Sequence, residues 1–118
     1  MERPNKWLLL KVTTADGEEQ YRVFGTWSGG YLDGDSWAMG SSIKEVVNGD
    51  EGYVCTTQSG NEYLCRYGMQ GVAGAYNGGV LETLEHRFEK VNQKLEILQE
   101  DEAIDRFQIF MYRAKNEG

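Results

Sequence analysis

The residue types best suited to bind a ligand gather in one glycine-rich stretch, residues 66–79. Glycines let backbone N–H groups turn toward a ligand, and the start of a following helix adds unpaired donors with partial positive charge. The arginine of this stretch has a forked guanidinium suited to phosphate oxygens, and its tyrosines can stack on a base or ribose. The candidate ligand-binding residues here are Arg66, Tyr67, Gly68, Tyr76 and Asn77. The pattern indicates a nucleotide phosphate site, but the residue types alone favour a plainer alternative, a crossover whose glycines only permit close packing.

Two further candidates, Phe88 and Asn92, are four residues apart in the C-terminal third of the chain. On one helix, an aromatic ring for base stacking and an amide for a base edge would then share a pocket. Phe88 also belongs to an apolar stripe, which favours core packing as the role of its ring.

Arg106 and Arg113 are seven residues apart and would share one face of a final helix, where they could meet anionic groups of a ligand. Surface ion pairs with Asp105 and Glu102 are the favoured alternative, because such pairs are common on exposed helices. Earlier in the chain, Trp27 and Trp37 are either anchors of a glycine-rich loop or an aromatic clamp, and anchoring is favoured.

The residues available for catalysis are few. His86 is the one histidine, and no nucleophile-elbow, Walker-loop or Cys-x-x-Cys pattern occurs. Cys55 and Cys65 flank a predicted hairpin and are expected to be reduced. We therefore expect a protein that is not an enzyme and has neither a cofactor nor a metal site.

Length and charge narrow the class of protein. A chain of 118 residues fits one domain, here predicted to span residues 1–118, with a core of its own. A net charge of −7 argues against general binding to DNA or RNA, which needs a basic face. We expect no membrane span and no export signal, since no long apolar run and no basic segment before an apolar one occurs.

The distribution of glycine divides the chain into parts, and the fold of these parts must position the candidate ligand-binding residues. Fourteen of the fifteen glycines lie at or before Gly79. We predict an α+β domain with a β-sheet part (6–67), a glycine-rich crossover (68–79) and a helical part (80–115). The sheet part is expected to form one antiparallel sheet of about five strands, near residues 7–12, 21–24, 43–47, 53–57 and 62–67.

The helical part is predicted to contain two C-terminal helices. Asn77 is expected to cap the first, whose apolar stripe recurs at three- and four-residue intervals from Leu81 to Val91. Residues 94–98 suit either a strand or a continued helix, and a break into a strand is favoured. Acidic residues at 100–102 favour the start of the last helix. Its apolar side exceeds what one sheet needs, which suggests a partner subunit.

The segments Gly25–Trp37, Ser59–Cys65 and Tyr67-Gly68 resemble small proteins of phages and prophages of gut Clostridia. The layout of a β-rich first half and two C-terminal helices, over residues 6–112, is similar to the phage Thoeris anti-defence sponge family of the first-described Tad type. That resemblance implies a hexameric, non-catalytic protein that binds cyclic ADP-ribose isomers made by TIR-domain enzymes. It also implies, for some members, separate sites for the cyclic trinucleotides of CBASS defence.

In that family, aromatic rings stack on adenine and arginines meet phosphates. Matching residue types in this chain are Arg66, Phe88, Asn92, Arg106 and Arg113. The expected function is thus sequestration of cyclic nucleotide signals in the cytoplasm of a bacterial host. The alternative is an acidic phage protein that inhibits a host defence complex by binding it directly, although its charges are not grouped into a negative stripe.

Overall fold

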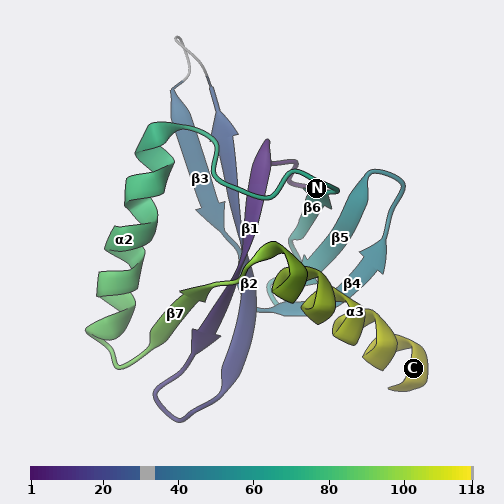
Figure 1. Cartoon of the computed structure of the whole chain (residues 1–118). Coiled ribbons are helices and arrows are strands. Elements are labelled where there is room, and N and C mark those ends of the chain that lie inside the picture. Colours follow the sequence, from purple (N-terminus) through teal and green to yellow (C-terminus); the bar gives the residue numbers. More distant parts are fainter. Residues whose placement is uncertain (30–33, 118) are drawn as a thin grey trace.

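The computed structural model describes residues 1–29 and 34–117. Residues 30–33, within the predicted aromatic loop, and Gly118 lie outside the described residues. The elements, in chain order, are β1 (Lys6–Thr13), β2 (Glu19–Ser28), β3 (Asp35–Met39), β4 (Ile43–Asn48), β5 (Gly52–Thr57), β6 (Glu62–Arg66), α2 (Ala75–Glu89), β7 (Lys94–Ile97) and α3 (Glu100–Glu117). Figure 1 shows this arrangement, with α2 and α3 on different sides of the strands.

The predicted α+β class is confirmed, and so is the strand interpretation of residues 94–98. The strands are more numerous than expected and form two antiparallel sheets instead of one, with orders β3-β2-β1-β7 and β4-β5-β6. The additional strand β3 was not predicted from the sequence, because its polar start and the preceding glycines are typical of a loop. It pairs with β2 from Phe24↔Met39 to Ser28↔Asp35.

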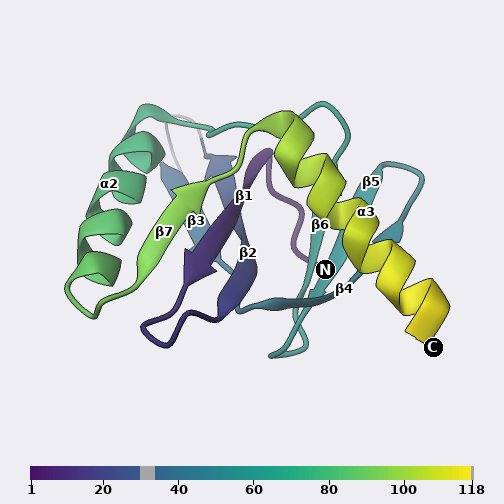
Figure 2. The ribbon, with the colours of Figure 1, turned by 60° about the horizontal axis from the view of Figure 1, so that its bottom comes forward.

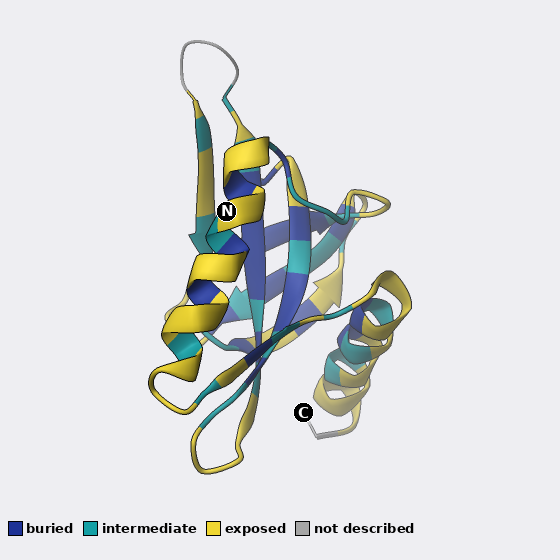
Figure 3. Ribbon diagram, turned by 60° about the vertical axis from the view of Figure 1, so that its left-hand side comes forward, coloured by how far each residue is buried: buried dark blue, intermediate teal, exposed yellow. Residues whose placement is uncertain are grey.

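The four-stranded sheet is buried on both faces because its β1 and β2 strands carry apolar residues at consecutive positions. One face packs Leu10 and Phe24 against Leu81 and Leu84 of α2. The other face packs Leu9 and Val23 against the three-stranded sheet and Phe107 of α3. Figure 3 shows the buried stripe of α2 turned toward the strands and its exposed side turned outward.

The two helices begin and end with recognisable signals. The side chain of Glu102 accepts a hydrogen bond from the backbone N–H of Gln99 (3.3 Å), which satisfies a donor at the start of α3. At the end of α2, Asn92 has a left-handed backbone (φ 58°), and the N–H of Gln93 donates to the carbonyl of Phe88 (2.9 Å). This is a Schellman motif with asparagine where glycine is usual. The predicted stripe therefore stops before Val91, which is exposed.

Helix α3 lies against the three-stranded sheet through β4. Trp7 and Tyr53 place their rings 5.5 and 4.7 Å from Phe107, which anchors the middle of the helix. Figure 2 shows that the C-terminal end of α3 extends beyond the strands. Residues 112–116 of this end are exposed.

Candidate functional site

The glycine-rich crossover packs against the body of the protein through its backbone. The N–H of Gly71 donates to the carbonyl of Trp7 (2.9 Å), and the N–H of Ala73 donates to the buried hydroxyl of Thr26 (2.8 Å). These two donors are therefore bound within the chain and do not face a ligand.

The start of α2 already has an anion beside it. Gly74, the residue before the helix, has φ +85°, and a Cβ there would overlap both carboxylate oxygens of Asp35. A carboxylate is favoured near the positive end of a helix. The predicted phosphate position at this helix start is thus next to the protein's own carboxylate.

Arg66, Tyr67 and Gly68 lie at the end of β6, on the three-stranded sheet. The carbonyl of Arg66 accepts a hydrogen bond from the indole of Trp7 (2.8 Å). The hydroxyl of Tyr67 donates to the carbonyl of Gly49 (2.9 Å), and its ring meets that of Tyr53 edge-on, with centroids 5.1 Å apart. These contacts tie Arg66 and Tyr67 to the body of the protein.

Asn77 has a different role from the predicted helix cap. It is fully buried in the first turn of α2, which starts two residues before it. Its amide donates to the carbonyls of Ser36 (2.9 Å) and Ala73 (2.8 Å), so it joins α2 to β3. Its side-chain oxygen has no partner among the described residues. The cap prediction was wrong because the glycines at 78 and 79 lie inside the helix instead of before it.

Phe88 and Asn92 do not share a helix face, because α2 ends at Glu89. The ring of Phe88 packs at the edge of the core formed with Leu81 and Leu84. Asn92 reverses the chain direction after the helix, as described above. The packing alternative for Phe88 therefore agrees with its position.

Arg106 and Arg113 lie on α3, and Figure 1 shows this helix and α2 on different sides of the strands. The guanidinium of Arg106 lies over the ring of Tyr21, 4.4 Å from its centroid. Between residues 34 and 117, neither arginine forms the expected ion pair with Asp105 or Glu102. The prediction was wrong for Arg106 because the aromatic ring takes the place of the carboxylate.

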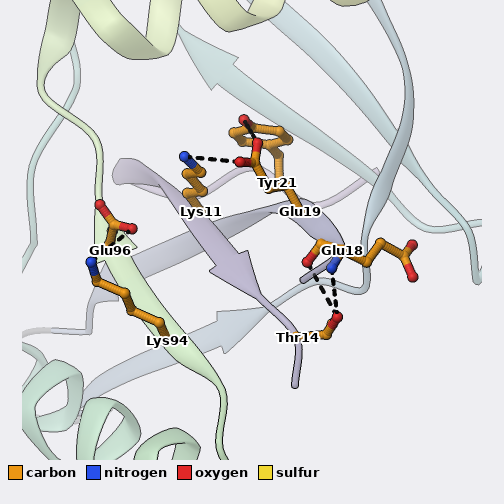
Figure 4. A network of polar contacts seen from close by, with 7 residues as sticks. All are labelled: Lys11, Thr14, Glu18, Glu19, Tyr21, Lys94 and Glu96. Carbon is orange, nitrogen blue, oxygen red and sulfur yellow. Dashed lines mark hydrogen bonds and ion pairs between the residues drawn. The ribbon is translucent and has the colours of Figure 1, made fainter. Parts of the chain in front are cut away.

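Tyr21 belongs to a polar network on the α3-facing side of the first sheet (Figure 4). Its hydroxyl donates to a carboxylate oxygen of Glu19 (3.3 Å), whose other oxygen lies 3.4 Å from the ammonium of Lys11. Burial raises the pKa of Tyr21, and the charge of Arg106 opposes that shift. Lys11 is paired with Glu19 in this network, and the guanidinium of Arg106 is held against the Tyr21 ring, so both cations already have a partner within the chain.

One cleft combines aromatic rings with an unmatched cation. It lies between β3 and α2 and has a volume of about 270 Å³. Its described lining consists of Trp37, Tyr76, Gly79, Val80, Thr83, Leu84 and Arg87. Within the described part of the chain, Arg87 has no acidic partner in an ion pair.

The two rings of this cleft are accessible. Trp37 is 36% exposed and Tyr76 is 67% exposed. Gly79 leaves space between them and the helix, since a Cβ at that position would meet nothing within 4 Å. The cleft can therefore accept a flat ring against aromatic faces, with an anionic group near the guanidinium.

Of the predicted site residues, only Tyr76 lines this cleft, and sequence reasoning missed Thr83 and Arg87. The sequence contains a spacing pattern that could have identified these two residues. Residues 76, 80, 83 and 87 follow one another at intervals of four, three and four, which places them on one face of a helix. Trp37 was considered as a clamp, and the structure places its ring in the cleft.

A second cleft, of about 350 Å³, lies between the end of α2 and β7. Glu85, Glu89 and Glu96 line it, with Lys94 bridged to Glu96 at 3.5 Å. Three carboxylates around one lysine disfavour an anionic ligand. The cleft at Trp37 is thus the better candidate for a nucleotide.

The other reactive groups have ordinary structural positions. Cys55 and Cys65 are free and buried, with sulfur atoms 3.9 Å apart, as expected for reduced strand residues. His86 is exposed and lies 3.9 Å from Glu89. The described residues contain no cluster of three or more His, Cys, Asp or Glu side chains that could hold a metal ion.

Comparisons with family models, with curated proteins and with solved structures find no significant match to this chain. None of the described helices combines the length and the apolar character needed to cross a membrane.

Proposed function

We propose that this protein sequesters a cyclic nucleotide immune signal, without cleaving it, in the cleft between β3 and α2. The observation that carries the proposal is one cleft in which the rings of Trp37 and Tyr76 accompany the guanidinium of Arg87. Aromatic rings stack on bases of any sequence, and a guanidinium binds phosphate oxygens through two parallel hydrogen bonds. The signals that fit are cyclic ADP-ribose isomers from TIR-domain enzymes and, by the same chemistry, CBASS cyclic oligonucleotides.

The chemistry of the lining supports storage of a ligand instead of its conversion. None of the described lining residues carries a carboxylate, an imidazole or a thiol. General acid–base catalysis at neutral pH most often uses one of these groups. The proposed protein is therefore a binding protein, works without a cofactor, and acts in the cytoplasm of a phage-infected bacterium, where such signals are made.

The size of the cleft supports a role for a second copy of the chain. A volume of about 270 Å³ is slightly below that of sites that enclose a drug-sized ligand, roughly 300–1,000 Å³. On α3, Ile109 and Tyr112 face outward, and Tyr112 is 69% exposed. In the proposed homo-oligomer, with six copies as the family resemblance implies, this face joins protomers, and an arginine of α3 can reach a ligand held by another copy.

Direct inhibition of a host defence protein is the second candidate function, and the same outward face of α3 supports it. Tyr112→Asp separates the two, with Lys115→Gln as a control of equal charge change on the exposed end of the helix. Under the first proposal, only Tyr112→Asp converts the purified oligomer to monomer in light scattering. Under the second, the wild type is already monomeric and binds a host protein with no nucleotide bound.

Thermal denaturation with candidate ligands tests the proposal. A ligand at 100 times its dissociation constant stabilises the folded protein by about 2.7 kcal/mol. We expect cyclic ADP-ribose isomers to raise the unfolding temperature of the wild type, and Arg87→Gln to reduce that rise. Lys44→Gln, at an exposed lysine on β4, is the control for the loss of one charge. No shift with any cyclic ADP-ribose isomer or cyclic oligonucleotide would contradict the proposal.

A further inference from the structure

The cleft has chemically different ends. Near the start of α2, the carboxylate of Asp35 fills the space beside Gly74. Toward the last turn of α2, the guanidinium of Arg87 lines the cleft. The ring of Tyr76 lines the cleft near the start of α2, and Trp37 lines it from β3. Asp35 does not line the cleft itself, but it lies two residues before Trp37 on β3 and beside the residue that precedes α2. The approach to the cleft from the start of α2 is thus negative, and its far end, at Arg87, is positive.

The position of Asp35 changes what the start of α2 can bind. The first N–H groups of a helix have no partner within the helix and attract anions. A carboxylate at this position satisfies that electrostatic preference and repels a second anion that approaches the same end. Asp35 and Trp37 are two residues apart on β3, so their side chains share the sheet face that α2 covers.

The distance along α2 between the aromatic rings and Arg87 sets the size of a ligand that can contact both. Tyr76 and Arg87 are eleven residues apart, which corresponds to about 16 Å along the helix axis. Helical side chains lean toward the N-terminus, so the guanidinium of Arg87 reaches back along α2, but the ring of Tyr76 leans the same way and stays a similar distance from it. Trp37 lines the same cleft from the facing strand, so a ligand whose anionic group is separated from its ring by a sugar contacts Arg87 and Trp37 more readily than Arg87 and Tyr76.

We infer that Asp35 and Arg87 give the cleft a polarity that orients its ligand, an inference that rests on the proposed nucleotide-binding function. The ligand is a nucleoside carrying phosphate, with its base against Trp37 and its phosphate at Arg87. Asp35 is a specificity-determining residue that keeps phosphate away from the start of α2. The opposite orientation, with phosphate at Gly74, is excluded by charge.

The polarity is tested by measuring the binding of adenosine and of adenosine 5′-monophosphate with tryptophan fluorescence and calorimetry. The wild type should bind the monophosphate about tenfold more tightly than the nucleoside, because one charged hydrogen-bonding group is gained. Arg87→Gln should reduce this ratio to about one. Adding Asp35→Asn to Arg87→Gln should restore the ratio to about two- to fivefold, because the start of α2 then becomes available to phosphate.

Adding Asp105→Asn to Arg87→Gln is the matched control, since it gives the same net charge through an acidic residue of α3. The ratio should stay near one in that variant. The inference is overturned if Arg87→Gln keeps the wild-type affinity ratio. It is also overturned if adding Asp35→Asn to Arg87→Gln raises the ratio no more than adding Asp105→Asn does. If cyclic ADP-ribose binds while these ratios fail, only the polarity is wrong. If neither it nor the two probes bind at millimolar concentration, the proposed function falls as well.

Discussion

The indole of Trp37 stacks on the ring of Phe24, with centroids 5.7 Å apart and planes inclined by 25°. The two residues lie on adjacent strands and on the same face of the first sheet, since Phe24 pairs with Met39 and Thr26 pairs with Trp37. Phe24 is fully buried, so the indole rests on a rigid support. Its orientation in the cleft is therefore set before any ligand arrives.

Trp37→Ala is expected to weaken nucleotide binding far more than it weakens folding. Stacking of a base on an aromatic side chain contributes about 1–3 kcal/mol, so affinity should fall roughly 5- to 150-fold. Trp37→Phe should retain most of the affinity because it keeps a ring on Phe24. Calorimetry with a cyclic ADP-ribose isomer gives the affinities, and urea titration gives the stability. Equal affinity in the alanine variant and the wild type would remove Trp37 from the site.

Arginine substitutions distinguish the cleft from the site predicted at the glycine-rich stretch. Arg87→Ala should lower affinity for a phosphate-containing ligand by about tenfold or more, because a charged hydrogen-bonding group is lost. Arg66→Ala should lower it less, since Arg66 lies at the end of β6 on the other sheet. The reverse order, measured in the same titrations, would move the ligand from the cleft to the end of β6.

Gly74→Ala should destabilise the fold. A residue with a Cβ in a left-handed conformation costs about 1–2 kcal/mol, and overlap with the Asp35 carboxylate adds to that cost. Gly78→Ala is the matched control inside α2, where a Cβ would meet nothing within 4 Å. It should stabilise the protein by about 0.5–1 kcal/mol. Urea denaturation measures the stability of the two variants. Equal stability would contradict the placement of Asp35 beside Gly74.

Alkaline pH is expected to lower stability, with Cys65 as one cause. Burial raises the pKa of this thiol well above its ordinary value of 9.0. In the unfolded chain the thiol ionises near its ordinary pKa, while in the folded protein it stays protonated. Its contribution is therefore complete below pH 9 and declines as the pH rises, by up to about 1.4 kcal/mol per pH unit.

Denaturant titrations between pH 7 and 10 measure this slope. Cys65→Ala should reduce the slope above pH 9, whatever its effect on stability at pH 7. The tyrosines Tyr21, Tyr53 and Tyr63 also have pKa values raised by burial, so part of the decline should remain at higher pH. An unchanged slope in the alanine variant would show that the thiol does not contribute.

Local sequence signals predicted those elements of the fold whose patterns are self-contained. The Asp16-Gly17 turn and the apolar residues on each side indicated the hairpin that β1 and β2 form. The acidic residues at 100–102 indicated the start of α3. The second sheet was missed because separation into sheets depends on which strands meet in space. No local pattern distinguishes the edge of one sheet from the start of the next.

The candidate site was harder to predict, for a physical reason. Glycine-rich sequence indicates backbone freedom, yet Gly74 uses that freedom to accommodate Asp35. Trp37 and Arg87 are fifty residues apart in sequence and lie in one cleft only because β3 lies beside α2. The helical spacing from Tyr76 to Arg87 was visible in the sequence, but the strand opposite it was not.

Recovery of the bound small molecule tests the central claim most directly. The protein is incubated with lysate from cells in which a TIR-domain enzyme has been activated, washed, denatured by heat, and the released material is analysed by mass spectrometry. We predict release of an intact cyclic ADP-ribose isomer from the wild type and much less from Arg87→Gln. Release of no nucleotide, or of a cleaved product, would contradict sequestration in this cleft.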